Sequence, residues 1–158
     1  MLTQELYMKL ALNDAYKNLK TMDGGPFGAC LVKNGKVLAT ARNTVLKNQD
    51  PTCHAEINAI RIASRKLKSF DLSKCVIYST TEPCPMCFSA IHWARIGTVV
   101  YGTTTRDAKK AGFNELVIED SKLKKLGGSK VKLKRSLLLK ECRALFEAWA
   151  KLPKKKSY

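Results

Sequence analysis

Two short segments constrain the fold of this chain more than any other feature of its sequence. The segment DPTCHAEINAI (50–60) contains His54, one of only two histidines, and TEPCPMCF (81–88) contains Cys84 and Cys87. Imidazole nitrogen and thiolate sulfur are preferred zinc donors, and three protein ligands with one open position are typical of a catalytic zinc site. The sequence therefore predicts a fold that brings these two segments together around one ion.

The spacing within each segment supports this interpretation. The prolines around Cys84 predict the start of a helix, where free backbone N–H groups and the helix dipole favour the thiolate form that binds metal. Glu56 is expected beside the ion and not bound to it, because it points to a different side of its helix from His54. A carboxyl group in that place can carry protons between water and a heterocyclic substrate.

Alternative uses of these residues explain less. A closed structural zinc site needs a fourth ligand, but His92 follows Cys87 by five positions and is expected to face away from it. Cys53 is a weaker candidate for that fourth ligand. A redox-active Cys-x-x-Cys pair would leave His54 and Glu56 without a role.

Composition is consistent with one globular domain over residues 1–158, in which about 153–158 form a tail. The chain is 45% hydrophobic, enough for a core, and no apolar run approaches the roughly 20 residues that span a bilayer. We expect a cytoplasmic protein with no membrane association, whose six cysteines are reduced thiols. Cys30, Cys75 and Cys142 lie among apolar residues and are expected to be buried.

Charge is distributed unevenly along the chain. The formal net charge is +16, and residues 122–158 hold 13 Lys and Arg against 2 acids. Such a segment is suited to RNA, a phosphate-bearing ligand or an anionic surface, and it is equally typical of a solvated face.

Helical and strand patterns alternate along the sequence, which predicts a sheet with helices packed on its faces. Asn34-Gly35 lies between two apolar runs and predicts a β-hairpin, so the sheet is expected to be mixed. Further strands are expected at 75–80, 98–103 and 131–138. Helices are expected at 6–19, with Leu6 and Leu10 on the apolar face, and at 138–152. Two more helices are expected, one capped by Thr52 and one that starts at Cys84.

Several longer segments together resemble the guanine deaminases of the cytidine deaminase-like superfamily: GGPFGACLV, ARNTV, DPTCHAEINAIR, EPCPMCFSAIHWAR and AGFNE. His-x-Glu followed by Pro-Cys-x-x-Cys is itself the signature of zinc deaminases. The similarity runs from about residue 24 to 115 and returns at KKKSY. It implies an α/β fold, a three-layer α/β/α sandwich with a five-stranded mixed sheet. It also implies hydrolysis of guanine to xanthine and ammonia, and a homodimer.

The resemblance also implies roles for individual residues. These are zinc binding by His54, Cys84 and Cys87; proton transfer by Glu56; substrate contacts by Asn43, Phe27, Trp93 and Ala55; and closure of the site by Tyr158, which in that family comes from a swapped partner segment. Glu115 stands where the family pattern GFDD has aspartate, and is expected to contact the purine and assist proton transfer. The family's small residue before the histidine is Cys53 here.

Three other functions remain open at this level. The motifs also resemble tRNA-specific adenosine deaminases, although GGPFGA is longer than the usual entry of that group and GFNE differs from it. Deamination of guanosine or cytosine is a second possibility. A third is a zinc-stabilised nucleic-acid-binding module without catalysis, against which the intact Glu56 argues.

Overall fold

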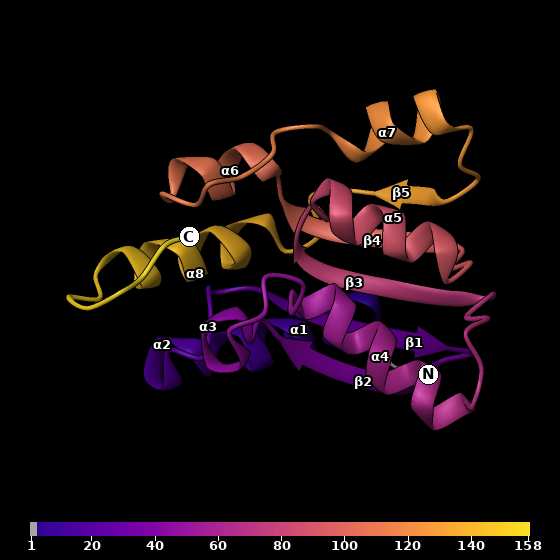
Figure 1. Ribbon diagram of the computed structural model, residues 1–158, viewed down its shortest axis with the longest axis horizontal. Coiled ribbons are helices and arrows are strands. Elements are labelled where there is room, and N and C mark those ends of the chain that lie inside the picture. The colour runs from indigo at the N-terminus through magenta and orange to yellow at the C-terminus, as the bar shows by residue number, and fades with distance from the viewer. Residues whose placement is uncertain (1–2) are drawn as a thin grey trace.

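A central five-stranded sheet organises the chain. The computed structural model describes residues 3–158 (Figure 1), with the strands in the order β2-β1-β3-β4-β5. β1 pairs antiparallel with β2 and β3, whereas β3, β4 and β5 run parallel, so the predicted mixed sheet is confirmed. The strands are β1 Gly28–Lys33, β2 Lys36–Arg42, β3 Cys75–Thr81, β4 Thr98–Thr103 and β5 Lys132–Lys134.

Helices cover both faces of this sheet and complete the expected three layers (Figure 1). α1 (Gln4–Tyr16) and α8 (Leu139–Ala150) pack on one face. α4 (Ala55–Leu67) and α5 (Pro85–Trp93) pack on the other, with α7 (Asp120–Gly127) beside α5. The shorter helices are α2 Asn18–Thr21, α3 Val45–Asn48 and α6 Thr105–Lys110.

The period-two alternation of strand side chains builds a separate core on each face. In β1, Ala29 and Leu31 belong to the core under α4 and α5, whereas Cys30 and Val32 belong to the core under α1 and α8. β3 and β4 alternate in the same way. Both faces are thus apolar, which explains why the strands read as continuous hydrophobic runs in the sequence.

The hairpin prediction is confirmed in detail. Lys33 pairs with Lys36, and the two residues between them, Asn34 and Gly35, have φ of 49° and 76°. This left-handed pair matches the twist of the flanking strands and is the reason for Asn-Gly at such a turn. Cys30, Cys75 and Cys142 are buried free thiols, as expected.

Three local predictions are wrong. Thr52 does not cap a helix, because its N–H and hydroxyl donate to Asp50 Oδ1 at 2.8 and 2.7 Å. The capping position of α4 is occupied by His54, two residues later. The last strand is limited to β5, because the chain turns toward α8 after Lys134. Leu6 is exposed on α1, whereas Leu10 is half-buried and packs against the core as expected; the buried stripe of that helix is Tyr7, Met8, Ala11, Leu12 and Ala15.

Among residues 3–158, no helix has both the length and the apolar character needed to cross a membrane.

Candidate zinc centre and active site

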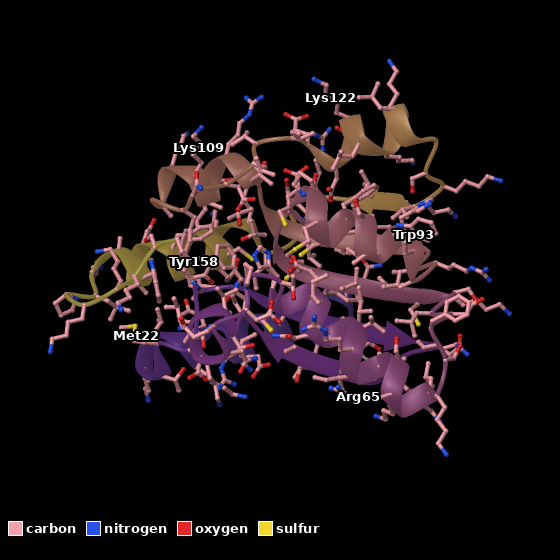
Figure 2. The ribbon with its side chains drawn as sticks, in the orientation of Figure 1. Met22, Arg65, Trp93, Lys109, Lys122 and Tyr158 are labelled. Carbon is pink, nitrogen blue, oxygen red and sulfur yellow. The ribbon has the colours of Figure 1, made fainter. Side chains whose placement is uncertain are left out.

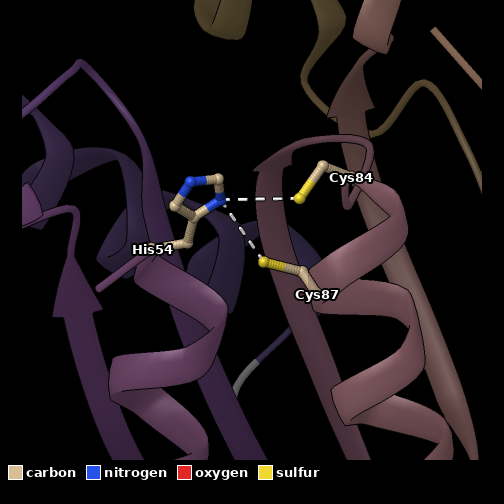
Figure 3. Close-up of side chains that lie close together, drawn as sticks. All are labelled: His54, Cys84 and Cys87. Atoms are coloured by element: carbon tan, nitrogen blue, oxygen red, sulfur yellow. Dashed lines mark hydrogen bonds between the residues drawn. The ribbon is translucent and has the colours of Figure 1, made fainter. Parts of the chain in front are cut away.

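The three predicted zinc ligands lie at the starts of two adjacent helices (Figure 3). His54 is the residue before α4, Cys84 is the residue before α5, and Cys87 is the third residue of α5. Pro85 is the first helical residue of α5, a position that needs no N–H donor. Because α4 and α5 pack together on one face of the sheet, their starts converge, and the two sequence segments meet as predicted.

The separation of the donor atoms fits zinc. His54 Nδ1 lies 3.5 Å from both Cys84 Sγ and Cys87 Sγ, and the three atoms lie within 4.8 Å of one another. A tetrahedral ion with Zn–S of about 2.3 Å and Zn–N of about 2.1 Å would separate the nitrogen from each sulfur by about 3.6 Å. One nitrogen and two sulfurs are also a typical zinc donor set. Among residues 3–158 this is the one group of three acidic, cysteine or histidine side chains close enough to hold an ion.

The local electrostatics prepare the two thiols differently. Hydrogen bonding from the Cys87 side chain and the neighbouring His54 lower the pKa of Cys84 to about 4, whereas the hydrogen bond to Cys84 and burial raise the pKa of Cys87. Burial opposes the charged form of His54, but the hydrogen bond and charge of Cys84 outweigh it and raise the pKa of His54. A metal ion would favour the deprotonated form of all three side chains.

Glu56 lies beside these ligands and is almost completely buried. Ser79 Oγ donates to its Oε1 at 2.8 Å, and Cys87 Sγ lies 3.4 Å from its Oε2. Burial raises the pKa of Glu56. The carboxyl group is therefore held in one orientation next to the donor atoms, without being one of the grouped donors.

A pocket of about 170 Å³ opens directly onto His54, Glu56 and Cys84. It also contains four of the residues for which a substrate contact or a catalytic role was expected: Asn43, Phe27, Glu115 and Tyr158. Its remaining lining residues are Pro51, Thr81, Glu82, Phe113 and Asn114.

Aromatic rings form the wall of this pocket. Phe27 meets Phe113 edge to face at 4.9 Å between ring centroids, and Phe113 meets Tyr158 in the same way at 5.8 Å. Trp149, fully buried in α8, supports Phe113 from behind. Such a narrow apolar slot is suited to a flat ring.

Asn43 supplies the polar end of the pocket. Its Oδ1 accepts from Val45 N at 3.0 Å and from the Tyr158 hydroxyl, which in turn accepts from Gly25 N at 3.0 Å. Tyr158 O also accepts from Asn114 N at 3.0 Å. The 153–158 segment therefore folds back onto the pocket of its own chain (Figure 2).

Glu115 is half-buried in the same pocket. Burial and the negative charge of Cys84 raise its pKa to about 7. At neutral pH this carboxyl group can therefore either give or take a proton, which is the behaviour required of an acid/base residue.

Other predicted residues lie elsewhere. Trp93 is 77% exposed at the end of α5 and lines a different groove, and Ala55 is buried at the start of α4 outside the lining of the pocket. His92 contacts Ser129 at 3.1 Å, and Cys53 contacts Arg61 and Asp50, so neither belongs to the group of donors.

Asn18 is a site residue that the sequence pattern did not reveal. It is fully buried in α2, and its Nδ2 donates to Gly25 O at 2.7 Å and to Asn43 O at 2.8 Å. It thereby fixes the backbone on both sides of the polar end of the pocket. No motif surrounds it, and a helical asparagine carries no signal of its own.

Glu82 also escaped notice, although it precedes the Pro-Cys motif. Its carboxylate accepts from Thr105 N at 3.3 Å and Asp120 N at 3.0 Å, so it ties the starts of α6 and α7 to the end of β3. Asp120 lies beside it, fully buried, and its carboxyl oxygens have no hydrogen-bond partner among residues 3–158. Burial, and to a smaller extent the negative charge of Glu82, raises the pKa of Asp120 to about 9.

Comparison with known proteins agrees with this geometry. The protein-family model named cytidine and deoxycytidylate deaminase zinc-binding region matches residues 1–103 of the sequence. The chain belongs to this deaminase family. The expected fold and the zinc cofactor are thereby confirmed, and His54, Cys84 and Cys87 are the grouped donors that suit the ion.

Individual relatives of this deaminase span most of its length. A guanine deaminase from Bacillus subtilis is 37% identical over 99% of this chain and 100% of its own. A tRNA-specific adenosine deaminase from Buchnera aphidicola is 36% identical over 86% of each chain. The solved structure of a guanine deaminase from Nitrosomonas europaea superposes with a TM-score of 0.86 at 27% identity, covering 95% of this chain and 86% of the other.

Proposed function

We propose that this protein hydrolyses guanine to xanthine and ammonia. One observation carries the proposal: a zinc donor set, a buried carboxyl group, aromatic walls and an amide all surround the same pocket. The similarity to a guanine deaminase over the whole chain supports the choice of guanine.

The chain's own residues divide the work of such a reaction. Zinc bound by His54, Cys84 and Cys87 supplies a Lewis acid that lowers the pKa of water from about 15.7 toward about 7. Glu56, held by Ser79, takes one proton from the attacking water and gives it to a ring nitrogen; it then carries a second proton, from the hydroxyl group added to the base, to the departing amine. Burial raises the pKa of Glu56, which makes its carboxylate a stronger base for the first of these transfers.

Substrate binding falls to the other lining residues. The Phe27 ring packs against the flat base, and the Asn43 amide forms a hydrogen bond with the base. Glu115 contacts the base and assists proton transfer; its pKa of about 7 suits that role, and the pocket must accommodate its extra methylene relative to aspartate.

Tyr158 closes the pocket over the bound base. The variant Tyr158→Phe keeps the ring against Phe113 and removes the hydroxyl that bonds to Asn43 and Gly25. We expect KM for guanine to rise roughly 3- to 10-fold, the equivalent of about 1 kcal/mol of hydrogen bonding, with kcat changed less. Tyr16→Phe, at an exposed tyrosine of α1, is the matched control and should leave KM unchanged.

Deamination of adenosine in tRNA is the second candidate, favoured by the Buchnera relative and the basic residues 122–158. The closure by Tyr158 argues against it, because a pocket of about 170 Å³ covered by a side chain leaves little room for a ribose and its phosphates. Guanosine is disfavoured for the same reason, and cytosine fills the slot less well.

Ultraviolet-monitored turnover by the zinc-loaded protein tests these alternatives directly. Guanine, guanosine, cytosine and an anticodon stem-loop containing adenosine are compared at equal concentrations. We expect turnover of guanine to exceed the others by at least 10-fold. Inosine formation in the stem-loop without activity on guanine would reverse the choice, and activity on none of them would favour a binding module.

We further propose a homodimer in the cytoplasm. Trp93 and Leu126, each 77% exposed, border a groove of about 430 Å³ that includes Phe88, and large apolar side chains of this kind are typical of interfaces. Trp93 would then serve the interface, and the segment ending in Tyr158 could exchange with that of a second copy. The cytoplasm suits six free thiols.

Light scattering tests the assembly. We expect the mass of a dimer for the native protein and of a monomer for the double variant Trp93→Ala, Leu126→Ala. Phe70→Ala, at an aromatic residue that is 68% exposed and lies outside the groove, should remain a dimer. A monomer mass for the native protein would contradict the proposal.

A further inference from the structure

A second cavity, of about 300 Å³, lies between the edge strand β2 and helix α4. Four cationic side chains line it, and we call it the arginine pocket: Arg42 from β2, Lys47 from α3, and Arg61 and Arg65 from α4. It shares no lining residue with the pocket at the zinc ligands. The arginine pocket is therefore a separate feature, which the deaminase reaction does not use.

Two of these cations are already paired with acids. Arg42 donates to Asp23 at 2.7 Å and lies 3.8 Å from Asp14, and Lys47 lies 3.9 Å from Asp23. Asp14 also lines the pocket, and its Oδ1 lies 2.5 Å from Lys17 Nζ, so the two carboxylates are occupied by Arg42, Lys47 and Lys17 and do not neutralise the rest of the pocket.

The two arginines of α4 have no acidic partner within 4.0 Å among residues 3–158. Arg61 donates only to neutral groups, Cys53 Sγ at 3.4 Å and Thr52 Oγ1 at 3.1 Å. Arg65 is exposed, and Figure 2 shows it on the outer side of α4.

The spacing of these arginines makes their like charges unfavourable for the helix. Residues four apart lie on the same helical face, and equal charges there repel each other. The one acid of α4 is Glu56, which is buried at the zinc site. Nothing on the helix offsets the repulsion, so an anion bound between the two side chains would relieve it.

We propose that the arginine pocket binds the phosphate group of a small ligand. Guanidinium groups bind phosphate oxygens through two parallel hydrogen bonds, and two of them from successive turns match a dianion. The ammonium group of Lys47 and the hydroxyl groups of Thr40 and Thr44 border the same space and provide further donors. The volume is at the lower end of that seen for small-molecule sites, which fits a phosphate or a sugar phosphate.

Isothermal titration calorimetry on the zinc-loaded protein, at constant ionic strength set with sodium chloride, tests the proposal. The probes are inorganic phosphate and ribose 5-phosphate, neither of which contains a base for the active site. Tighter binding of the first indicates a site for the free anion, and tighter binding of the second a site for a phosphate ester. Either result supports a phosphate site.

Variants locate the bound probe. The double variant Arg65→Gln, Lys47→Gln leaves the hydrogen bonds of Arg61 to Thr52 and Cys53 in place. It should weaken binding of the probe at least 10-fold, because charged hydrogen bonds to the phosphate are lost. Arg61→Gln with Arg65→Gln should weaken it further.

The matched control removes two positive charges at the opposite edge of the sheet. Lys122→Gln with Lys125→Gln changes exposed lysines of α7 and should leave the dissociation constant within 2-fold (Figure 2). Three results would each overturn the proposal. The first is no binding of either probe by the native protein. The second is binding that persists in both double variants, as expected if phosphate binds to the zinc ion instead, and the third is an equal loss of affinity in the control.

Discussion

Replacing Glu56 by glutamine separates its chemical role from its structural one. The two side chains have nearly the same shape, and the amide oxygen of glutamine can still accept the Ser79 hydroxyl that now bonds to Oε1 at 2.8 Å. The side chain is almost completely buried, so it has little freedom to move elsewhere. Glu56→Gln should therefore fold as the native protein does and keep its zinc, while losing the group that takes and gives protons.

The size of the loss follows from that role. Proton transfer by a positioned side chain contributes typically 10²- to 10⁴-fold in rate, or about 3–5 kcal/mol of barrier. Because the proposed mechanism gives Glu56 two transfers in one reaction, we expect the upper half of this range. The loss should appear in kcat, with KM changed less than 3-fold, since the aromatic walls and Asn43 that we propose hold the base are intact.

Steady-state turnover of guanine, zinc content by metal analysis and thermal unfolding are measured on the same preparation. Glu147→Gln, at an exposed glutamate of α8, is the control and should behave as the native protein. Two outcomes refute the reasoning. Loss of zinc from Glu56→Gln would make Glu56 a ligand, and a fall in kcat of less than 10-fold would assign the proton transfers to another group.

Other perturbations test the metal site, the packing and the electrostatics. Cys84→Ser should lose zinc and unfold at a lower temperature than the native protein, whereas Cys53→Ser should retain one zinc per chain by metal analysis, because only the first sulfur belongs to the donor group. Gly28→Ala should cost about 3 kcal/mol or more in urea unfolding, since its Cβ would lie 2.1 Å from a backbone oxygen of α1. Gly127→Ala, whose Cβ meets nothing within 4 Å, should change stability by less than about 1 kcal/mol. Asp120 has a pKa of about 9 in the folded state against about 3.9 unfolded, so its contribution to stability is complete below pH 4 and is lost as the pH rises toward 9. Asp120→Asn should therefore gain stability over the native protein by up to about 1.4 kcal/mol per pH unit across that interval, and a constant difference would contradict the assigned pKa.

The zinc centre was predictable from sequence because its chemistry is local to two motifs. Cys84 and Cys87 lie within one helical turn, and proline fixes where that turn begins. The sheet was predictable because buried strands and amphipathic helices leave distinct periods in the sequence. The turn at Asn34-Gly35 was equally clear, since few residues tolerate its backbone angles.

Features that depend on competing contacts, or on contacts between separate segments, were not predictable. Helical spacing shows that Trp93 lies on a face of α5, but not which part of the molecule that face meets, and the structure places it 77% exposed. Thr52 was a reasonable cap by residue type, yet Asp50 competes for its N–H and hydroxyl. The arginine pocket was not predictable because it depends on how β2, α3 and α4 pack together, whereas the largest excess of positive charge in the sequence lies in residues 122–158.

The polar end of the pocket shows how such distant contacts prepare a site before substrate arrives. Asn18 holds the carbonyl groups of Gly25 and Asn43, and a Cβ on Gly24 would lie 2.1 Å from Asn43 Oδ1. Gly24 is therefore required by the close approach of its backbone to the amide, whereas a Cβ on Gly25 would meet the rings of Phe27 and Phe113 at 2.7 and 2.8 Å. With its oxygen bonded to Val45 N and to the Tyr158 hydroxyl, Asn43 retains its amide nitrogen to offer to the base. An amide fixed in this way favours a ligand that presents a hydrogen-bond acceptor to its nitrogen. A ligand without that acceptor would leave the buried N–H donor unpaired. This cost is how a small pocket rejects close analogues.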